Sequence, residues 1–254
     1  MKKIGIVGGV SWPSTVAYYA GICRLAEQAH AAAHLGGVPA YPEFVIESLS
    51  HKRAVESLGK DPDEDSWREF DAYHADALRR VEASGADFAL IASNTPHHRF
   101  LAITKGIRIP MLNLFDELAA AAASEASGEV LVLGTAITMG SAPLAEAFLK
   151  RGIHAAGPAS PSAREATIQL IRDYHTGNEA DSLDRLDEIV AREVSARPGK
   201  TPTVCLACTE LSLVFQRPED ASSFEHGGLT FLDSTWVHIR AAYQAATGER
   251  SLGT

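Results

Sequence analysis

Cys208 is the side chain best placed to do chemistry, because it follows the apolar run TVCLA and precedes the polar pair Thr209 and Glu210. A cysteine at a helix start lies near backbone N–H groups, which favour the thiolate. We therefore expect thiolate character and an acid/base or nucleophilic role for Cys208. Cys205 lies inside the same apolar run, where we expect it to be buried and inert. The two residues also spell C-x-x-C, but a redox dithiol normally has both sulfurs accessible at a helix start.

Four apolar runs end in turns with small polar side chains: IGIVGGVSW, DFALIASNT, VLVLGTAIT and TVCLACTEL. They form two similar pairs, which indicates a weak internal repeat of roughly half the chain. Hydroxyl and amide donors beside an acid/base group can neutralise a carboxylate and the enediolate that forms when the adjacent carbon loses a proton. We expect the turns to hold a small carboxylic acid through Ser11, Asn94, Thr95, Thr135, Thr138 and Thr209.

Basic side chains follow two of the predicted strands. Lys52, Arg53 and Arg164 could bind a second carboxylate of the substrate, or could be solvated surface charges. His97 and His98 closely follow the DFALIASNT run, and an imidazole titrates near neutrality, so either could assist proton transfer. The alternative is that they only shape the turn.

Metal and nucleotide sites are not predicted. The ten histidines are scattered, without metal-ligand spacing. Gly5, Gly8 and Gly9, with Glu47 as a possible ribose ligand, do not complete G-x-G-x-x-G, because Val10 stands where a glycine is needed. We expect these glycines to let the backbone approach a small ligand. The acidic stretch DPDEDS is expected to be a solvated loop.

The elements that must position these residues alternate between apolar strands and amphipathic helices. This alternation predicts parallel sheets, whose sites form at the carboxyl ends of the strands. Strands are predicted at 2–9, 43–49, 87–92, 109–115, 129–134, 153–157, 203–208 and 228–233. Helices are predicted after Ser14 with Val16, Tyr19 and Cys23 on one side, from Ser66 to Gly85, and at 116–126, 141–150, around 168–171, 179–197 and 234–246.

The chain length fits two α/β units. With 254 residues, we predict a first unit of residues 1–113 plus 216–254 and a second of residues 114–215. A duplicated unit would bring two equivalent turns to face one small molecule across a cleft. The expected fold class is therefore α/β, with two similar subdomains, each a mostly parallel sheet flanked by helices, and the active site between them.

Composition excludes several classes of protein. The formal net charge is -9, with 23 Lys+Arg against 32 Asp+Glu, and no basic cluster suits a nucleic acid. No apolar run approaches the roughly 20 residues that span a bilayer, and the start lacks the features of a signal peptide. Three cysteines form no disulfide framework. We expect a cytoplasmic protein that binds neither nucleic acid nor membranes.

Five stretches together resemble the aspartate/glutamate racemase family: GGVSWPSTVAYY, ADFALIASNTPH, LGTAITM, LACTEL and LDSTWVHIRAA. The resemblance extends from end to end, and LACTEL and the SNT turn are its most specific parts. It implies an amino-acid racemase that needs no pyridoxal phosphate or other cofactor, and commonly a homodimer. It also implies two similar subdomains, each supplying one catalytic cysteine beside the substrate α-carbon. The second of these cysteines falls on Cys208.

The first catalytic cysteine of that family is absent, because Ser93 stands directly before Asn94 and Thr95. A serine hydroxyl is a much weaker base than a thiolate unless a neighbour activates it. The sequence therefore predicts racemisation of an aspartate- or glutamate-like amino acid by Cys208 with Ser93 as the weaker partner. Two alternatives remain open: one-cysteine chemistry such as decarboxylation or isomerisation, and binding of a small carboxylic acid without turnover.

Overall fold

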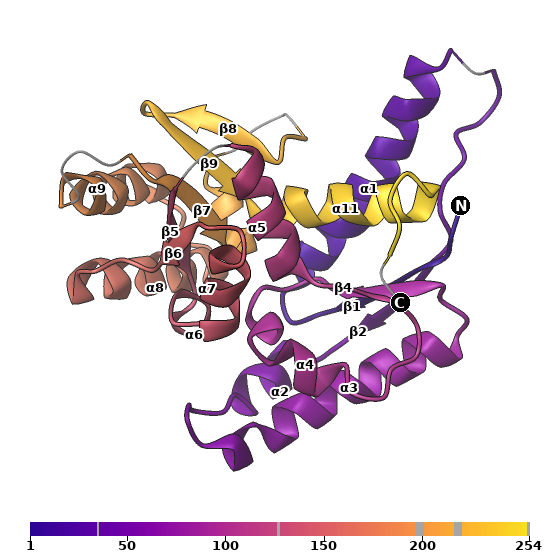
Figure 1. The fold of residues 1–254 in the computed structure, drawn as a ribbon, viewed down its shortest axis with the longest axis horizontal. Coiled ribbons are helices and arrows are strands. Elements are labelled where there is room, and N and C mark those ends of the chain that lie inside the picture. Colours follow the sequence, from indigo (N-terminus) through magenta and orange to yellow (C-terminus); the bar gives the residue numbers. More distant parts are fainter. Residues whose placement is uncertain (35, 126–127, 197–200, 216–219, 253–254) are drawn as a thin grey trace. The chain divides into compact units, whose positions relative to one another are not determined.

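The structure, a computed structural model, describes residues 1–34, 36–125, 128–196, 201–215 and 220–252. The chain divides into two compact units. The first comprises Met1–Asn113 and Ile239–Thr254, and the second comprises Leu114–His238. Each unit is a β-sheet packed with helices (Figure 1). The predicted α/β class with two similar, mostly parallel sheets is confirmed.

The first unit contains a parallel four-stranded sheet in the order β2-β1-β3-β4. Its strands are β1 (Ile4–Gly8), β2 (Phe44–Ser48), β3 (Phe88–Ile91) and β4 (Met111–Leu112). Its helices are α1 (Trp12–Ala32), α2 (His51–Glu56), η1 (Glu64–Trp67), α3 (Arg68–Ala83), η2 (Thr95–Arg99) and α4 (Phe100–Ile103), and most of α11 (Ser234–Thr247) also belongs to it.

Burial explains the positions of these elements. Every residue of β1 and β3 is buried, as expected for central strands of a parallel sheet covered on both faces. Helix α3 buries the predicted apolar side, including Phe70, Ala77 and Val81, and the chain leaves it through Gly85 with a positive φ of 79°.

Helix α1 differs from expectation in its start and its buried side. It begins at Trp12 after Ser11, and the residues it buries include Tyr18 and Ile22. The side that carries Val16 and Tyr19 is exposed, at 57% and 47%. Apolar spacing identified a helix correctly but did not identify which apolar side the core would cover.

The second unit contains a five-stranded sheet in the order β6-β5-β7-β9-β8, parallel except for the antiparallel pair β8 and β9. Its strands are β5 (Glu129–Gly134), β6 (His154–Ala156), β7 (Thr203–Ala207), β8 (Ser223–His226) and β9 (Leu229–Asp233). Its helices are α5 (Leu114–Ser124), α6 (Ala136–Met139), α7 (Ala142–Leu149), α8 (Pro161–His175), α9 (Ser182–Ser195) and α10 (Thr209–Leu213).

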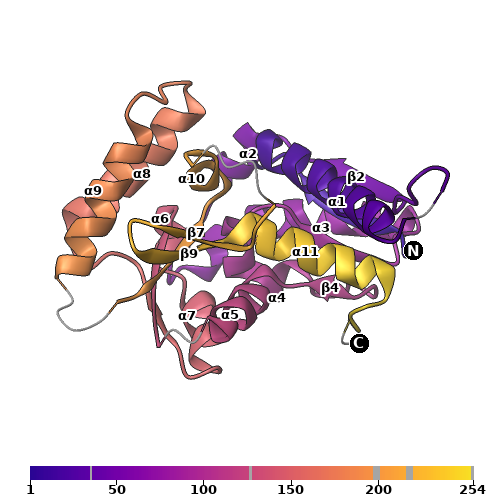
Figure 2. The same cartoon turned by 90° about the horizontal axis from the view of Figure 1, so that it is seen from above.

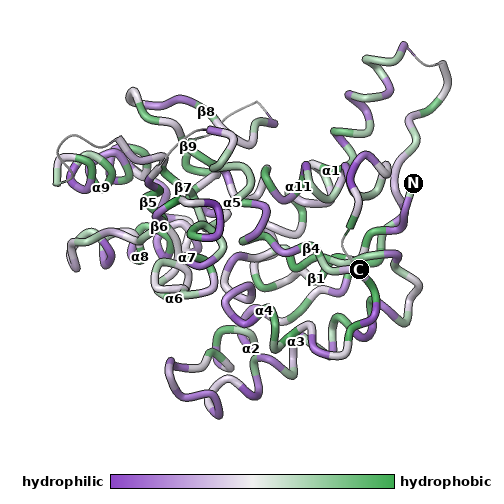
Figure 3. Tube along the Cα trace, in the orientation of Figure 1, coloured by the Kyte–Doolittle hydropathy of each residue, from purple (hydrophilic) through white to green (hydrophobic). Residues whose placement is uncertain are grey.

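The second sheet separates two apolar clusters. Along β5, Val130 and Val132 point into a cluster with α5 and α7, whereas Leu131 and Leu133 point into one with α8 and α9. Helices α8 and α9 lie side by side (Figure 2). Helix α9 alternates hydrophobic and hydrophilic segments (Figure 3), as expected for a helix with one side on the core.

The second unit extends further along the chain than predicted. We expected residues from 216 onward to complete the first unit, but β9 pairs with β7, and the structural boundary lies between His238 and Ile239. The apolar run GLTFLD supplies a strand that covers the open edge of β7. Strand β8, which was not predicted, then pairs with β9.

The two sheets repeat one strand order, because β2-β1-β3-β4 corresponds to β6-β5-β7-β9. Strands β3 and β7, which precede Ser93 and Cys208, thus occupy equivalent positions. Within the described residues, no helix is both long and apolar enough to cross a membrane.

Candidate active site

The predicted site residues gather at one edge of each sheet. In the first unit, Ser11, Arg53 and Ser93 follow β1, β2 and β3, which run parallel. In the second unit, Thr135, Arg164 and Cys208 follow β5, β6 and β7 in the same way. Each unit therefore presents its candidate residues at the carboxyl ends of its strands, where parallel α/β sheets bind ligands.

The glycines after β1 serve the fold rather than ligand approach. A Cβ at Gly8 would lie 2.4 Å from Thr15 Oγ1, and one at Gly9 would lie 2.2 Å from the Leu49 carbonyl oxygen. Gly9 also has a positive φ of 81° and donates its N–H to Thr15 Oγ1 at 2.8 Å. The expectation that these glycines admit a ligand is corrected: the space belongs to Thr15 and Leu49, which fix the turn before Ser11.

The Ser93 turn is held by His97. Ser93 is partly buried, and its carbonyl oxygen accepts a hydrogen bond from His97 Nδ1 at 2.8 Å. Burial lowers the pKa of His97 to about 4, so the imidazole is neutral at physiological pH. The ring stacks on Phe100. Asn94, the residue before η2, is buried, and Thr95 begins η2. His97 therefore shapes the turn as a neutral donor.

A second set of contacts ties the acidic stretch to η2, which the sequence did not reveal. Asp61 accepts hydrogen bonds from His98 Nε2 at 2.9 Å and from Trp67 Nε1 at 3.0 Å. Arg99 pairs with Glu64 at 2.7 Å and with Asp71 at 2.8 Å. The acidic stretch is largely exposed, as expected for a solvated loop, and it also anchors the short helix that begins beside Ser93. Neighbouring charges along η2 were the only signal.

The turn after β5 is closed by its own threonines. Thr135 Oγ1 lies 3.0 Å from Thr138 Oγ1 and accepts the Thr138 N–H at 3.2 Å, so Thr135 caps α6. Thr138 is fully buried and Thr135 is partly buried. Of the two threonines of this turn that were predicted to hold a carboxylate, Thr135 is the one with accessible surface.

Cys208 lies between β7 and α10, where it is the N-cap residue of the short helix. Its side chain is buried, with 7% of the residue exposed. Cys208 Sγ donates a hydrogen bond to Glu210 Oε2 at 2.9 Å. Thr209, next in the chain, is also buried. Cys205 is fully buried, and burial raises its pKa to about 12, as expected for an inert thiol.

The protonation of Cys208 differs from expectation. Backbone N–H groups of Thr209 and Glu210 do lower the pKa of the thiol, but burial and the negative charge of Glu210 outweigh them and raise it well above 9.0. The expected thiolate character is therefore wrong for this conformation. Cys208 is a neutral thiol that can give a proton.

Glu210 and His175 complete this group, and sequence reasoning assigned a role to neither. Glu210 Oε1 accepts a hydrogen bond from His175 Nε2 at 3.0 Å. Burial alone would raise the pKa of Glu210, but the hydrogen bonds from His175 and Cys208 reverse this and lower it to about 2. The only sequence signal was the glutamate two residues after Cys208, because His175 belongs to a separate helix.

The three candidate cationic ligands already make contacts with the protein, and Lys52 Nζ lies 3.8 Å from Glu56. The Arg53 guanidinium lies 4.1 Å above the Tyr73 ring and 3.6 Å from Glu69. Arg164 is exposed, and its Nε donates a hydrogen bond to the Pro158 carbonyl oxygen at 2.6 Å.

Glu193 is a buried acid to which the sequence analysis assigned no role. It accepts hydrogen bonds from the backbone N–H groups of Ala159 and Ser160 and so holds the loop before α8.

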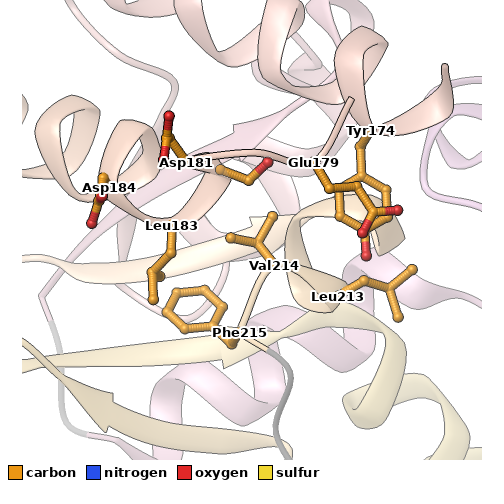
Figure 4. A pocket seen from close by; sticks show the side chains of 9 residues that line it. Tyr174, Glu179, Asp181, Leu183, Asp184, Leu213, Val214 and Phe215 are labelled. Atoms are coloured by element: carbon orange, nitrogen blue, oxygen red, sulfur yellow. The ribbon is translucent and has the colours of Figure 1, made fainter. Parts of the chain in front are cut away.

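A pocket of about 330 Å³ lies in the second unit (Figure 4). Tyr174, the α8–α9 connection and the end of α10 form its walls, and Glu179, Asp181 and Asp184 give it acidic groups. None of the predicted site residues lines it. Among the described residues, no group of three or more histidine, cysteine or acidic side chains is arranged to hold a metal ion.

Comparison with known proteins identifies the family and the fold of the chain. The family described as Asp/Glu/Hydantoin racemase matches residues 7–242. An aspartate racemase homologue from Pyrococcus horikoshii is 25% identical, with a TM-score of 0.73 over 97% of this chain and 100% of the other. Aspartate racemase from Picrophilus torridus is 17% identical, with a TM-score of 0.66 over 97% and 95%.

A third solved structure shares the fold at lower similarity. Glutamate racemase from Campylobacter jejuni is 16% identical, with a TM-score of 0.61 over 99% of this chain and 88% of the other. The family match covers both units and includes the turns that carry Ser93 and Cys208. The chain belongs to the Asp/Glu/Hydantoin racemase family.

Proposed function

We propose that the protein is a cofactor-independent racemase of a small acidic amino acid and that Cys208 transfers the α-proton. The observation that carries the proposal is the position of Cys208 at the carboxyl end of β7, where its thiol donates a hydrogen bond to the ionised carboxylate of Glu210. Family membership supports the same class of reaction.

Cys208 is proposed to act on one face of the α-carbon. As a thiol it protonates the carbanion, and as a thiolate it abstracts the α-proton; the proton lost in one direction is regained in the other. Because burial and Glu210 raise the pKa of the thiol, abstraction by Cys208 becomes faster as pH rises. The rate of α-proton abstraction should therefore increase with pH across the neutral range.

Ser93 is proposed to serve the opposite face. It follows β3 as Cys208 follows β7, at the equivalent place in a sheet of the same order. A hydroxyl returns a proton to a carbanion more readily than it abstracts one, because its conjugate base is strongly basic. We therefore expect one enantiomer, the one whose α-hydrogen faces Cys208, to react faster than the other.

The substrate is proposed to be held by its carboxylates. Asn94, Thr95 and Thr209 lie beside Ser93 and Cys208 in the chain, and Ser11 and Thr135 begin the turns of the neighbouring strands. Their hydroxyl, amide and N–H donors would neutralise the α-carboxylate and its enediolate. Arg53 and Arg164 are proposed to bind the side-chain carboxylate of aspartate or glutamate. We place the reaction in the cytoplasm, because all three cysteines are free thiols.

The test is incorporation of deuterium from solvent at the α-carbon of L- and D-aspartate and L- and D-glutamate. In Cys208→Ala we expect exchange to fall at least about a hundredfold, the usual contribution of a general acid or base. Cys23→Ala, which removes a partly exposed thiol of α1, is the matched control and should exchange normally. Unchanged exchange in Cys208→Ala would contradict the proposal.

The presence of Ser93 favours a second candidate function, binding of a small carboxylic acid without turnover. In that case the wild type shows no exchange, yet a small dicarboxylic acid raises its melting temperature. Ser93→Cys separates the two candidates. If the wild type is a racemase, the variant should react faster with the enantiomer whose α-hydrogen faces position 93. If the wild type only binds the acid, exchange should appear in the variant alone.

A further inference from the structure

His175 has an acceptor at each ring nitrogen. Nε2 lies 3.0 Å from Glu210 Oε1, and Nδ1 lies 3.1 Å from the Ile171 carbonyl oxygen, one turn earlier in α8. Neither oxygen carries a hydrogen when Glu210 is ionised, so both contacts are hydrogen bonds only if both ring nitrogens are protonated. The contacts of this ring are therefore those of an imidazolium, placed at the C-terminal end of a helix where a positive charge is favoured.

Glu210 divides its two oxygens between an acid and a cation. Oε2 accepts the Cys208 thiol, and Oε1 accepts His175. Its side chain is only 6% exposed, and a carboxylate so buried needs partners for its charge. The His175 side chain is 37% exposed. The cation that neutralises Glu210 is thus partly exposed to solvent, whereas the Cys208 residue is only 7% exposed.

We propose that His175 is a positioning residue for Cys208: its imidazolium holds Glu210 as a carboxylate and offsets the charge that Glu210 exerts on the thiol. This inference rests on the proposed function for its catalytic meaning. The effect on the ionisation of Cys208 does not require turnover, because it depends on the contacts from the exposed imidazole of His175 to the buried carboxylate of Glu210 and from that carboxylate to the thiol.

Other charges surround the end of α8. Asp173 of α8 forms an ion pair with Arg185 of α9 at 2.8 Å. Burial raises the pKa of Tyr174, and the negative charge of Glu179, in the α8–α9 connection, adds to this effect. From α10, the group that faces the imidazole is Glu210. The charges of Asp173 and Arg185 neutralise each other. The charge that acts on the Cys208 thiol is therefore that of Glu210, which is offset by His175.

This chain of contacts predicts an unusual pH profile for the reactivity of Cys208. The hydrogen bond to Glu210 raises the pKa of His175 above 6.5. Below the pKa of His175 the imidazolium is present, and its positive charge partly offsets the negative charge of Glu210. As the pH rises through the pKa of His175 this offset is lost, and the Cys208 thiol becomes harder to ionise. Thiolate formation, which normally gains tenfold per pH unit, should therefore gain less through the His175 transition, leaving a shoulder.

The experiment is alkylation of Cys208 by iodoacetamide in the full-length protein between pH 5.5 and 9.5, followed by mass spectrometry of the Cys208 peptide. In His175→Gln the shoulder should disappear, and the rate at pH 6 should fall by between about threefold and fiftyfold, the range for one unit charge two hydrogen bonds away at effective dielectric constants of 80 to 20. In His175→Lys, which keeps a cation throughout this range, the shoulder should disappear without loss of rate at pH 6.

Two further variants test that the effect passes through Glu210. Glu210→Gln removes the negative charge, so alkylation should be faster than in the wild type, and any shoulder should move to lower pH because His175 loses the hydrogen bond to Glu210 that raises its pKa. The double variant Glu210→Gln/His175→Gln should match Glu210→Gln alone at pH 7.5 and above. His226→Gln is the matched control, because His226 also pairs with a carboxylate, Asp187 at 2.8 Å, in the same unit; its profile should follow the wild type.

Three outcomes would overturn the proposal: a His175→Gln profile that superposes on the wild type, faster alkylation of that variant at pH 6, or an equal effect of His175→Gln in the Glu210→Gln background. Loss of packing at position 175 would alter stability but would not be rescued by lysine in the pH profile. Because alkylation needs no substrate, failure of the proposed role of His175 is distinguished from failure of the proposed racemase activity, which the deuterium experiment reports separately.

Discussion

At the scale of single residues, three buried acids of the second unit, Glu193, Asp233 and Glu210, differ in the groups that donate hydrogen bonds to them. Glu193 and Asp233 each accept two backbone N–H groups, which do not titrate. Glu210 instead accepts its hydrogen bonds from a thiol and an imidazole, which both do. All three satisfy the requirement that a buried charge be partnered. The titratable partners of Glu210 make its surroundings sensitive to pH, which is consistent with the proposed role of Cys208.

His97 gives a prediction for stability against pH. Its pKa is about 4 in the folded protein against 6.5 for an ordinary histidine. Below pH 6.5 the unfolded chain binds a proton that the folded chain does not, so stability falls as pH decreases from 6.5 towards 4. Between pH 7.5 and 5 this costs about 2 kcal/mol. His97→Gln should remove that part of the loss, measured by urea unfolding at both pH values.

The control for this measurement is His154→Gln, which changes an exposed histidine of β6. Its stability should depend on pH as in the wild type. If His97→Gln loses as much stability as the wild type between pH 7.5 and 5, the buried neutral state of His97 is wrong.

At the scale of elements, the approach of β5 to β7 sets the backbone just before Cys208. Gly134 pairs with Ala207 in the sheet, and a Cβ on Gly134 would lie 2.7 Å from the Ala207 carbonyl oxygen. Backbone cannot move aside as a flexible side chain can. A glycine on one strand therefore determines where the thiol on the next strand is held.

We predict that Gly134→Ala destabilises the protein by about 1 to 3 kcal/mol, the usual cost of an overpacked buried site. The melting temperature and the urea midpoint would report this. Deuterium exchange should also fall, since Cys208 is displaced. Gly140→Ala is the comparison, because a Cβ there lies 3.4 Å from its nearest neighbour; equal stability of the two variants would show that the β5–β7 contact is not tight.

At the scale of the whole molecule, the equivalent strands β3 and β7 are each followed by a side chain that is proposed to transfer a proton, the hydroxyl of Ser93 and the thiol of Cys208. The first unit also has exposed apolar side chains among its described residues. Trp12, Val16 and Tyr19 of α1 are 73%, 57% and 47% exposed, and Ile46 of β2, the edge strand, is 39% exposed. Exposed apolar side chains beside a strand edge are typical of an interface.

We predict that the protein is a homodimer in solution that uses this surface. Sedimentation equilibrium at micromolar concentration should give about twice the chain mass of 27.1 kDa. Val16→Asp should shift the equilibrium towards the monomer, whereas Leu149→Asp, an exposed apolar position of the second unit at 67%, should leave it unchanged. A species of 27.1 kDa at all concentrations would contradict the prediction.

The sequence by itself determined the alternation of strands and helices, the equivalence of the Ser93 and Cys208 turns, and the burial of Cys205. These depend on local periodicity and turn chemistry, which neighbouring residues encode. It also indicated two units, although it placed residues 220–238 in the wrong one, because a single apolar run does not say which sheet edge it will join.

Only the tertiary structure decided the protonation of Cys208. A local reading expected the helix start to stabilise a thiolate, but burial and the Glu210 carboxylate keep the proton on sulfur. His175, which balances that carboxylate, comes from a helix distant in the sequence. The charge of a buried group depends on everything within a few ångströms of it, and residues far apart in the chain become such neighbours only when the fold has formed.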